Sequence, residues 1–241
     1  MGRAIFLPDR FGWLAVLIVL ALGEGQARAD EIGRCMSSVA PCGYAQLWDV
    51  GVLVEKPMGD GHRISQGSGV YMGHGLVLTA AHVVRADPGH PRVTVTLDDV
   101  QIPGTVALMN AMENVDLAVI RVDETALAPQ RRARPGVAVC RYNPGADQPA
   151  VVISQRLVTR TRTIPVSTQS APGQGAWTNM LMAGLHPGNS GGGVFDPTQG
   201  CLWGIVVQEI TGRTAPNGPS FDHTVFIGAA DVWRFLSRFR G

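Results

Sequence analysis

The sequence predicts an all-β protein made of two antiparallel six-stranded β-barrels followed by a C-terminal α-helix. Only 6% of the residues are aromatic, while 30 are Gly and 16 are Pro, a composition that favours strands and turns over packed helices. Short apolar stretches recur between turn residues at fairly even intervals. These stretches fall into two series, and the segment between the series lacks apolar periodicity, which is typical of two barrels joined by a linker.

The overall composition excludes several classes of protein. With 241 residues, of which 45% are hydrophobic, the chain can bury a sizeable core and is neither disordered nor a coiled coil. Its 20 basic and 19 acidic side chains nearly balance, so no feature indicates a surface built to hold polyanions. We therefore expect no nucleic-acid partner.

Residues 1–29 have the pattern of an export signal. Arg3 and Arg10 give a positively charged start, the run from Phe11 to Gly23 is apolar, and Ala27-Arg28-Ala29 matches a cleavage site. The alternative, an uncleaved membrane anchor, is less favoured because the apolar run is shorter than the roughly 20 residues that a membrane span needs. The sequence predicts an exported mature chain that begins at Asp30, is periplasmic or secreted, and has no membrane attachment after cleavage.

The four cysteines all lie in the mature part, and residues 30–44 form an N-terminal segment that carries two of them. An exported chain meets an oxidising compartment in which disulfides persist. Three pairings are possible. Because Cys35 and Cys42 are close in the sequence, we expect them to close a small loop and Cys140 to pair with Cys201 across the fold. No Cys or His spacing fits zinc, so we expect no metal and no cofactor.

The first barrel is expected within residues 45–122. Each expected strand is an apolar or alternating stretch bounded by turn residues. The strands are 47–54, 65–72, 76–79, 92–97, 102–109 and 116–122. Residues 123–135 are interpreted as a linker, in which Arg131, Arg132 and Arg134 form a short basic run that is more typical of a solvated segment than of a partner-binding patch.

The second barrel is expected within residues 136–228, and the helix within residues 229–241. The same pattern of apolar stretches and turns predicts strands at 136–141, 150–158, 163–168, 177–183, 192–195, 202–208 and 224–228. From Ala229 to Phe239 the apolar residues follow helical spacing, with Asp231 early and Arg238 late, as the helix dipole favours.

Three short segments carry residues suited to catalysis. His82 follows the apolar run 76–78, where it could also be a structural histidine whose ring is satisfied by the backbone. Asp116 begins the apolar run 117–120, where it could also cap a turn. Ser190 is flanked by Gly188 and by three consecutive glycines from Gly191. A Gly-rich hairpin turn is the alternative there, but such glycines also let backbone N–H groups converge on a substrate carbonyl.

A serine hydroxyl becomes a good nucleophile when a base takes its proton and a carboxylate orients that base. His82 and Asp116 are the candidates for these roles. The segments Thr79-Ala80-Ala81-His82, Asp116-Leu117-Ala118 and 188–192 (GNSGG) then appear in the chain order His, Asp, Ser. In this combination the chain resembles the trypsin-like, chymotrypsin-fold serine peptidases.

The resemblance extends from about Ser65 to Phe239. The spacings of 34 residues from His82 to Asp116 and 74 from Asp116 to Ser190 are similar to those of the bacterial HtrA/Deg and glutamyl-endopeptidase branch, as are the segments 67–70 and 202–206. The HtrA/Deg enzymes append PDZ domains, which we do not expect here because the sequence ends directly after the predicted helix. A monomer is favoured.

The resemblance implies a serine endopeptidase that hydrolyses exported or extracellular proteins. Ser190 would be the nucleophile and His82 the general base, with Asp116 orienting His82. The N–H groups of Gly188 and Ser190 would form the oxyanion hole. Asn189 stands where the digestive enzymes have the Asp that pairs with a freed N-terminal amine, so activation by propeptide cleavage is not expected.

The resemblance also implies where the substrate side chain binds. Trypsin-like cleavage after Lys or Arg depends on an Asp six residues before the nucleophile, and that position here is Gly184. Cleavage after Lys or Arg is therefore not expected, and an uncharged side chain of small or medium size is. The residues around this site would be Gly184, His186, Val206, Val207 and Gln208. His186 leaves one alternative open, because glutamyl endopeptidases use a histidine near this site to hold an acidic residue.

Two other functions remain as alternatives. The pattern Gly188-x-Ser190-x-Gly192 also fits the nucleophile elbow of an α/β-hydrolase esterase, although a strand and turn follow the serine where the elbow requires a helix. A catalytically silent binding module on a protease fold is the second alternative, since a fold can persist without its chemistry.

Overall fold

The computed structural model describes residues 47, 49–58, 63–85, 91–110, 115–133, 136–155, 157–164, 179–213, 218 and 220–239. The predicted signal at 1–29 and the segment 30–44 with Cys35 and Cys42 lie outside these residues. All of the described residues belong to one compact unit, Cys42–Gly241.

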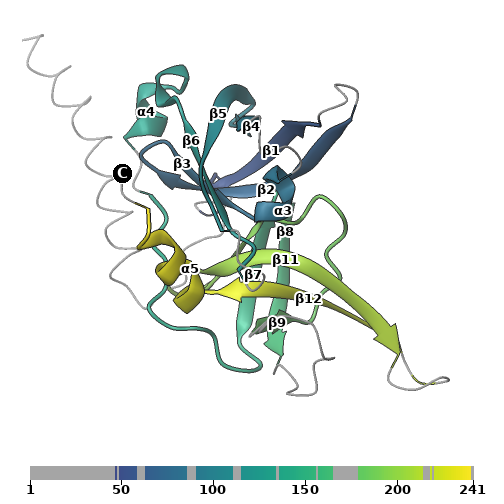
Figure 1. Cartoon of the computed structure of the whole chain (residues 1–241). Coiled ribbons are helices and arrows are strands. Elements are labelled where there is room, and N and C mark those ends of the chain that lie inside the picture. The colour runs from purple at the N-terminus through teal and green to yellow at the C-terminus, as the bar shows by residue number, and fades with distance from the viewer. Residues whose placement is uncertain are drawn as a thin grey trace, which may run out of the picture. The chain divides into compact units, whose positions relative to one another are not determined.

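Twelve strands of the described residues form two closed barrels with the same topology (Figure 1). The first barrel has the order β1-β2-β3-β6-β5-β4 and the second the order β10-β11-β12-β9-β8-β7. Neighbouring strands within each barrel pair antiparallel. The first barrel consists of β1 (Gly51–Pro57), β2 (Ile64–Gly73), β3 (Leu76–Thr79), β4 (Arg92–Leu97), β5 (Val100–Met109) and β6 (Ala118–Val122).

The second barrel consists of β7 (Pro149–Ser154), β8 (Leu157–Ile164), β9 (Asn179–Leu181), β10 (Gly193–Phe195), β11 (Leu202–Arg213) and β12 (Ser220–Gly228). The predicted fold class is confirmed. The described strands contain no parallel sheet with crossover helices, so the α/β-hydrolase architecture is wrong for this chain.

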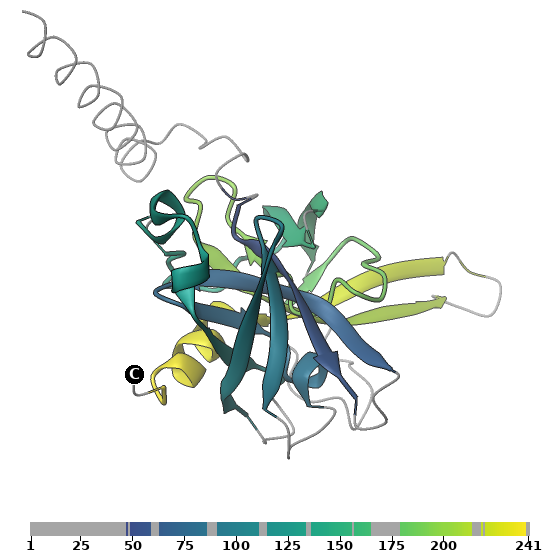
Figure 2. The ribbon, with the colours of Figure 1, turned by 90° about the horizontal axis from the view of Figure 1, so that it is seen from above.

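Strand alternation explains how the barrels bury their cores. In β4 the residues Val93, Val95 and Leu97 are buried while the residues between them face outward. In β7 five consecutive residues from Ala150 to Ser154 are buried, because the outer face of this strand is covered as well. Figure 2 shows β11 and β12 running side by side as a long ribbon, and their pairing continues as far as Arg213 with Ser220.

The structure differs from the predicted strands in the second series. Residues 136–141 form no strand, and only Val139 makes an isolated bridge, to Leu202. The stretch 150–158 is two strands, β7 and β8, because the chain reverses at Gln155. The expected strand 163–168 is the end of β8 as far as Ile164, while the expected strand 177–183 narrows to β9, with 165–178 outside the described residues.

The predicted linker is more structured than its composition indicates. It contains a 3₁₀ turn, η1 (Glu124–Ala126), and a short helix, α4 (Pro129–Arg132). Arg131 is buried rather than solvated. Its guanidinium lies 3.1 Å from the Asp98 carboxylate, stacks over the Tyr71 ring and donates to the carbonyl of Asp49. The solvated interpretation of the basic run is therefore wrong for Arg131.

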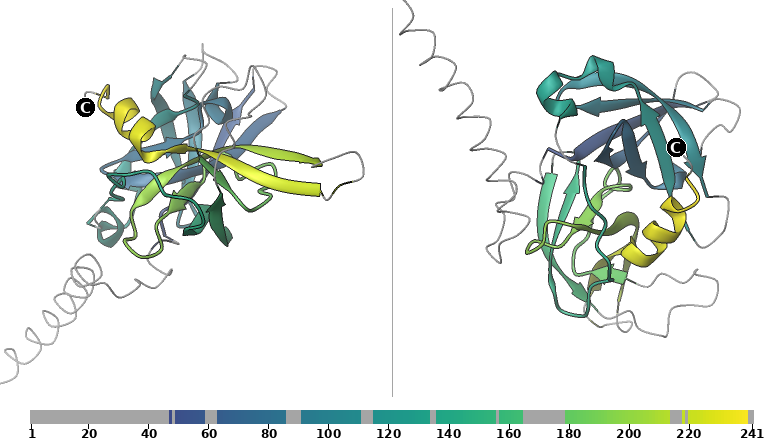
Figure 3. Two further views of the ribbon diagram at one scale, coloured as in Figure 1. Left: turned by 90° about the horizontal axis from the view of Figure 1, so that it is seen from below. Right: turned by 90° about the vertical axis from the view of Figure 1, so that its left-hand side faces the viewer.

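The C-terminal helix α5 (Ala229–Leu236) packs against β11 and β12 (Figure 3). It buries Ala229, Val232 and Phe235, as the helical spacing predicts. Beyond its end, the ring of Phe239 lies under the guanidinium of Arg121 on β6. Cys140 and Cys201 form a disulfide, as expected. In the part of the chain that the structure describes, no helix is long and apolar enough to cross a membrane.

Candidate functional site

His82 projects from a single helical turn directly after β3. This turn, α3 (Ala81–Val84), buries Ala81, Val83 and Val84 and leaves His82 exposed. Its side chain is 43% exposed, so the ring is accessible to a substrate. The buried alanine and valines thus fix the helical turn, and the histidine is the residue that the turn presents to solvent.

Asp116 reaches His82 because β3 and β6 pair in register, with Thr79 opposite Ala118. The residues next to this pair are then also adjacent, and the Ala81 N–H donates to the Asp116 carbonyl at 3.1 Å. One carboxylate oxygen of Asp116 accepts from the backbone N–H of His82 at 2.8 Å, and the other bonds the ring Nδ1.

These two hydrogen bonds to Asp116 determine how the imidazole of His82 can act. An ionised carboxylate only accepts hydrogen bonds, so it favours the tautomer with the proton on Nδ1 and leaves Nε2 as a free acceptor. The carboxylate of Asp116 is 18% exposed, which limits competition from water. His82 and Asp116, which the sequence offers as candidates, are therefore in direct contact in the structure.

Ser190 lies on a tight turn that is fastened to β11. The Gly191 N–H donates to the Val206 carbonyl at 2.8 Å, and the Val206 N–H donates to the Gly192 carbonyl at 2.9 Å. Gly188 has a φ of +99° and Gly191 a φ of +88°, which residues with a Cβ rarely adopt. The backbone of this turn therefore requires glycine at positions 188 and 191.

Strand β2 of the first barrel holds the same turn from the other side. The Ser68 N–H donates to the Ser190 carbonyl at 2.7 Å, and the Ser68 hydroxyl donates to the Gly188 carbonyl at 2.8 Å. A Cβ on Gly67 would lie 2.6 Å from a Val83 methyl group and 2.9 Å from the Ser190 carbonyl oxygen. The backbone of Gly67 thus lies between the turn of Ser190 and the helical turn of His82, with no room for a side chain.

Two residues that the sequence analysis missed hold the turn from the β7–β8 hairpin. The Gln155 side chain donates to the Gly188 carbonyl at 2.9 Å, and the Ser154 hydroxyl bonds the side-chain oxygen of Asn189 at 2.5 Å. The carbonyl of Gly188 therefore accepts two hydrogen bonds, one from each barrel. Within the described residues the N–H groups of Gly188 and Ser190 donate to no acceptor, so both remain available.

The remaining candidate residues lie on two segments. Val206 and Val207 are buried and Gln208 is exposed on β11, where a bulge between Val206 and Gln208 interrupts the pairing with β12. His186 is exposed, and its carbonyl accepts from the Asn189 N–H at 3.1 Å. In the described parts of the chain Ser190 and the ring of His82 share no hydrogen bond, and no three His, Cys, Asp or Glu side chains gather to hold a metal.

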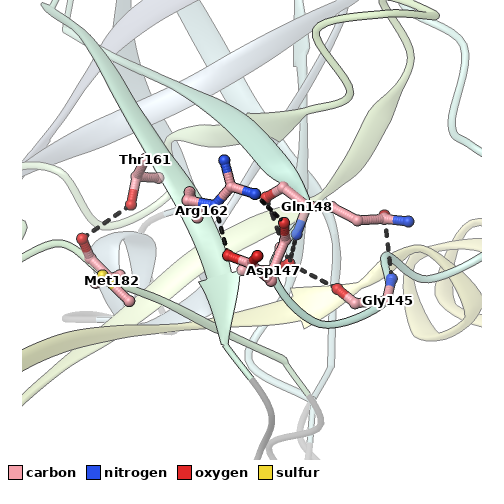
Figure 4. A network of polar contacts seen from close by, with 7 residues as sticks. Gly145, Asp147, Gln148, Thr161, Arg162 and Met182 are labelled. Atoms are coloured by element: carbon pink, nitrogen blue, oxygen red, sulfur yellow. Dashed lines mark hydrogen bonds and ion pairs between the residues drawn. The ribbon is translucent and has the colours of Figure 1, made fainter.

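The segment from 182 to 185, which leads to the turn of Ser190, is held by side chains of β8 and β12. Thr161 donates to the Met182 carbonyl at 2.9 Å, as Figure 4 shows. The same figure shows Arg162 bonded to Asp147 on the chain that enters β7, with Nε 2.5 Å from the carboxylate. This contact lowers the pKa of Asp147, first through the hydrogen bond and then through the charge of the guanidinium. From β12, the Thr224 hydroxyl donates to the Ala183 carbonyl at 2.6 Å.

Comparisons with known proteins agree with this architecture. A family model described as a trypsin-like peptidase domain matches residues 67–205, which is more than half of the chain. The Rv3671c protease from M. tuberculosis, in its active form, is similar to this chain with a TM-score of 0.58 and 18% identity, over 82% of this chain and 87% of that one. Its inactive form gives a TM-score of 0.53 and 19% identity, over 84% and 98%. No curated protein matches the sequence significantly.

Proposed function

The chain belongs to the trypsin-like peptidase family, and we propose that it is a serine endopeptidase that hydrolyses peptide bonds in exported or extracellular proteins. The observation that carries this proposal is the pair His82 and Asp116, in which one carboxylate holds both the backbone N–H and the ring of the histidine. A structural histidine would not need its ring oriented so that Nε2 stays free at an exposed site.

In the proposed reaction the Ser190 hydroxyl attacks the substrate carbonyl carbon while Nε2 of His82 takes its proton. The tetrahedral intermediate collapses to an acyl-enzyme when His82 returns that proton to the leaving amine. Water, deprotonated by His82, then hydrolyses the ester. Asp116 stabilises the imidazolium that forms in both steps. The hydrogen bond between Ser190 and His82 would form as the substrate binds, since catalytic contacts are often loose in the free enzyme.

The N–H groups of Gly188 and Ser190 would stabilise the oxyanion. Neither N–H is used by the described residues, and the Gly188 carbonyl is held by Ser68 and Gln155. A preorganised donor costs no reorganisation as charge develops, and losing one costs about 3 to 4 kcal/mol in a well-studied protease. These contacts support an oxyanion hole at this turn.

The proposed enzyme acts without cofactor on protein or peptide substrates, as a monomer after signal removal, in the periplasm or the medium. The spacing of His82, Asp116 and Ser190 supports a place near the HtrA/Deg and glutamyl-endopeptidase branch. Because Asn189 is bonded to Ser154 and carries no charge, the proposal includes no step in which a new N-terminal amine pairs with this position.

The test is fluorophosphonate labelling of the purified mature protein, with Ser190→Ala and His82→Ala as controls and circular dichroism to verify their fold. We expect labelling of the wild type alone, together with cleavage of a denatured protein substrate. A folded wild type that takes no label and cleaves nothing would contradict the proposal and favour the silent binding module.

A further inference from the structure

We propose that Asp222, on β12, sets the substrate preference and selects a lysyl or arginyl side chain on the acyl side of the scissile bond. The inference rests on the proposed peptidase function and deepens it. It reverses the expectation drawn from Gly184 alone, which was an uncharged side chain.

The main observation is the position of the Asp222 carboxylate. A Cβ built on Gly184 would lie 1.8 Å from Oδ2 of Asp222, 2.2 Å from its Cγ and 2.6 Å from Oδ1. The carboxylate therefore occupies the space in which a side chain at position 184 would begin. Any residue other than glycine at position 184 would displace the Asp222 carboxylate, because its Cβ would need the same space.

The register of β12 directs this side chain. β12 pairs with β9, with Thr224 opposite Leu181. The Thr224 hydroxyl donates to the Ala183 carbonyl at 2.6 Å and accepts from the Leu185 N–H at 3.2 Å, so this face of β12 contacts the segment 183–185. Asp222 lies two residues away on the same face, since side chains alternate along a strand. The carboxylate thus reaches Gly184 for the same reason that Thr224 reaches its neighbours.

Gly184 belongs to the segment that continues directly to Ser190. β11, which pairs with β12, is bonded to the turn of Ser190 through Val206, and its exposed Gln208 follows two residues later. In the proposed function, the substrate side chain next to the acylated carbonyl binds near the segment 184–186 and residues 206–208 of β11. Among substrate side chains, those of Lys and Arg combine length with the terminal positive charge that complements the Asp222 carboxylate.

The carboxylate of Asp222 is available to such a cation. It is solvent-exposed, and no cation or hydrogen-bond donor of the described residues contacts it. By contrast, the exposed carboxylate of Asp147 bonds Arg162, and the half-buried carboxylate of Asp231 on α5 bonds Arg234. The neighbouring His223 lies on the opposite face of β12, stacked on Phe221. An acidic substrate side chain would be repelled at this site, which argues against the role of His186 in holding glutamate.

The experiment compares the wild type with Asp222→Asn, which keeps the shape of the side chain and removes its charge. The matched control is Glu209→Gln, because Glu209 lies opposite Thr224 on β11 and is the nearest other carboxylate along this pairing. Peptides that differ at one residue, with Arg, Lys, Gln, Met or Glu before the scissile bond, report the preference as ratios of kcat/KM.

We expect the wild type to prefer Arg and Lys over Gln and Met by roughly tenfold to a hundredfold, the range for a hydrogen bond to a charged group. Asp222→Asn should lose this preference while its rate of fluorophosphonate labelling is unchanged, and Glu209→Gln should keep the preference. A wild type without the preference, an Asp222→Asn variant that retains it, or its loss in Glu209→Gln would each overturn the assignment.

A binding measurement separates this inference from the proposed function. Benzamidinium, a small planar cation, is titrated against Ser190→Ala and against the double variant Ser190→Ala/Asp222→Asn, so no catalysis is needed. Binding that requires Asp222 supports the cation site even if the protein hydrolyses nothing. Equal binding to both variants, or binding to neither, overturns it even if the peptidase is active.

Discussion

Replacing Gly191 by alanine tests whether the backbone of the nucleophile turn is as constrained as the structure indicates. Gly191 has a φ of +88°, and an added Cβ would lie 2.0 Å from the carbonyl oxygen of Ser68 and 2.3 Å from the hydroxyl of Thr79. Both of these residues are completely buried. Ordinary contact begins at 3.4 Å, so the backbone of either residue 191 or Ser68 must move by more than an ångström.

The expected cost has two parts. An L-residue in the left-handed region costs about 1 to 2 kcal/mol, and forcing an extra carbon into a packed site costs about 1 to 3 kcal/mol. Gly191→Ala should therefore lower the free energy of unfolding by about 2 to 5 kcal/mol. Gly200→Ala is the matched control, because Gly200 has a φ of +68° and nothing within 4 Å of the added carbon. It should lose only the first part, about 1 to 2 kcal/mol.

Urea unfolding of the oxidised protein, followed by tryptophan fluorescence, measures both free energies. The labelling rate of Ser190 by a fluorophosphonate reports whether the nucleophile has shifted; it should fall in Gly191→Ala and stay unchanged in Gly200→Ala. Equal destabilisation of the two variants, or normal labelling of Gly191→Ala, would refute the reasoning that β2 fixes this turn.

Three further outcomes follow from other contacts. Asp116→Asn should leave the fold intact and lower kcat by about 10⁴, the effect of the corresponding change in a well-studied protease, because the tautomer that it favours is wrong; a loss of less than tenfold in a peptide-hydrolysis assay would contradict the role of Asp116. Replacing Cys140 and Cys201 together by alanine should lower the free energy of unfolding by about 4 kcal/mol, since the disulfide closes a loop with a sequence separation of 61; urea unfolding checks this, and a change below about 1 kcal/mol would contradict the chain-entropy argument. Burial, followed by the hydrogen bond to Glu124, raises the pKa of Tyr71 from 10.0 to about 12. The stability contributed by protonated Tyr71 should be complete below pH 10 and lost as the pH rises towards 12, and thermal unfolding of Tyr71→Phe should lack this part of the decline.

The fold could be predicted because its signals are local. Each strand of the first series is an apolar stretch that ends at turn residues, and five residues of α5 and its extension follow helical spacing. The β7–β8 hairpin was missed for an equally local reason. Ser154 pairs with Leu157, and the turn between them contains no Gly, Asn, Asp or Pro. Gln155 nevertheless adopts a φ of +37° and bonds Gly188, so the turn that lacks a sequence signal is one that contacts the site.

The triad candidates could also be found, since His82 and Asp116 each stand beside an apolar run and Ser190 stands among glycines. Their supporting residues could not. Ser68 is 120 residues from Gly188, and Gln155 is 33 residues from it, so only the packing of the barrels brings them to the same carbonyl. Arg131 is a similar case. A run of three arginines within four residues predicts exposed side chains. Arg131 is buried because it contacts Tyr71 and Asp98, which lie far from it in the sequence.

The proposed role of Asp222 illustrates why the absence of a charged residue at one sequence position is weak information about a site. Comparison with a family pattern asks which residue stands at position 184, and glycine there predicts an uncharged site. A substrate cation instead responds to where a carboxylate lies, whatever chain position supplies it. Asp222 is 38 positions further along the chain, and its carboxylate fills the space that Gly184 leaves open. Gly184, which by itself predicts an uncharged site, is therefore the residue that leaves room for the carboxylate of Asp222 from β12.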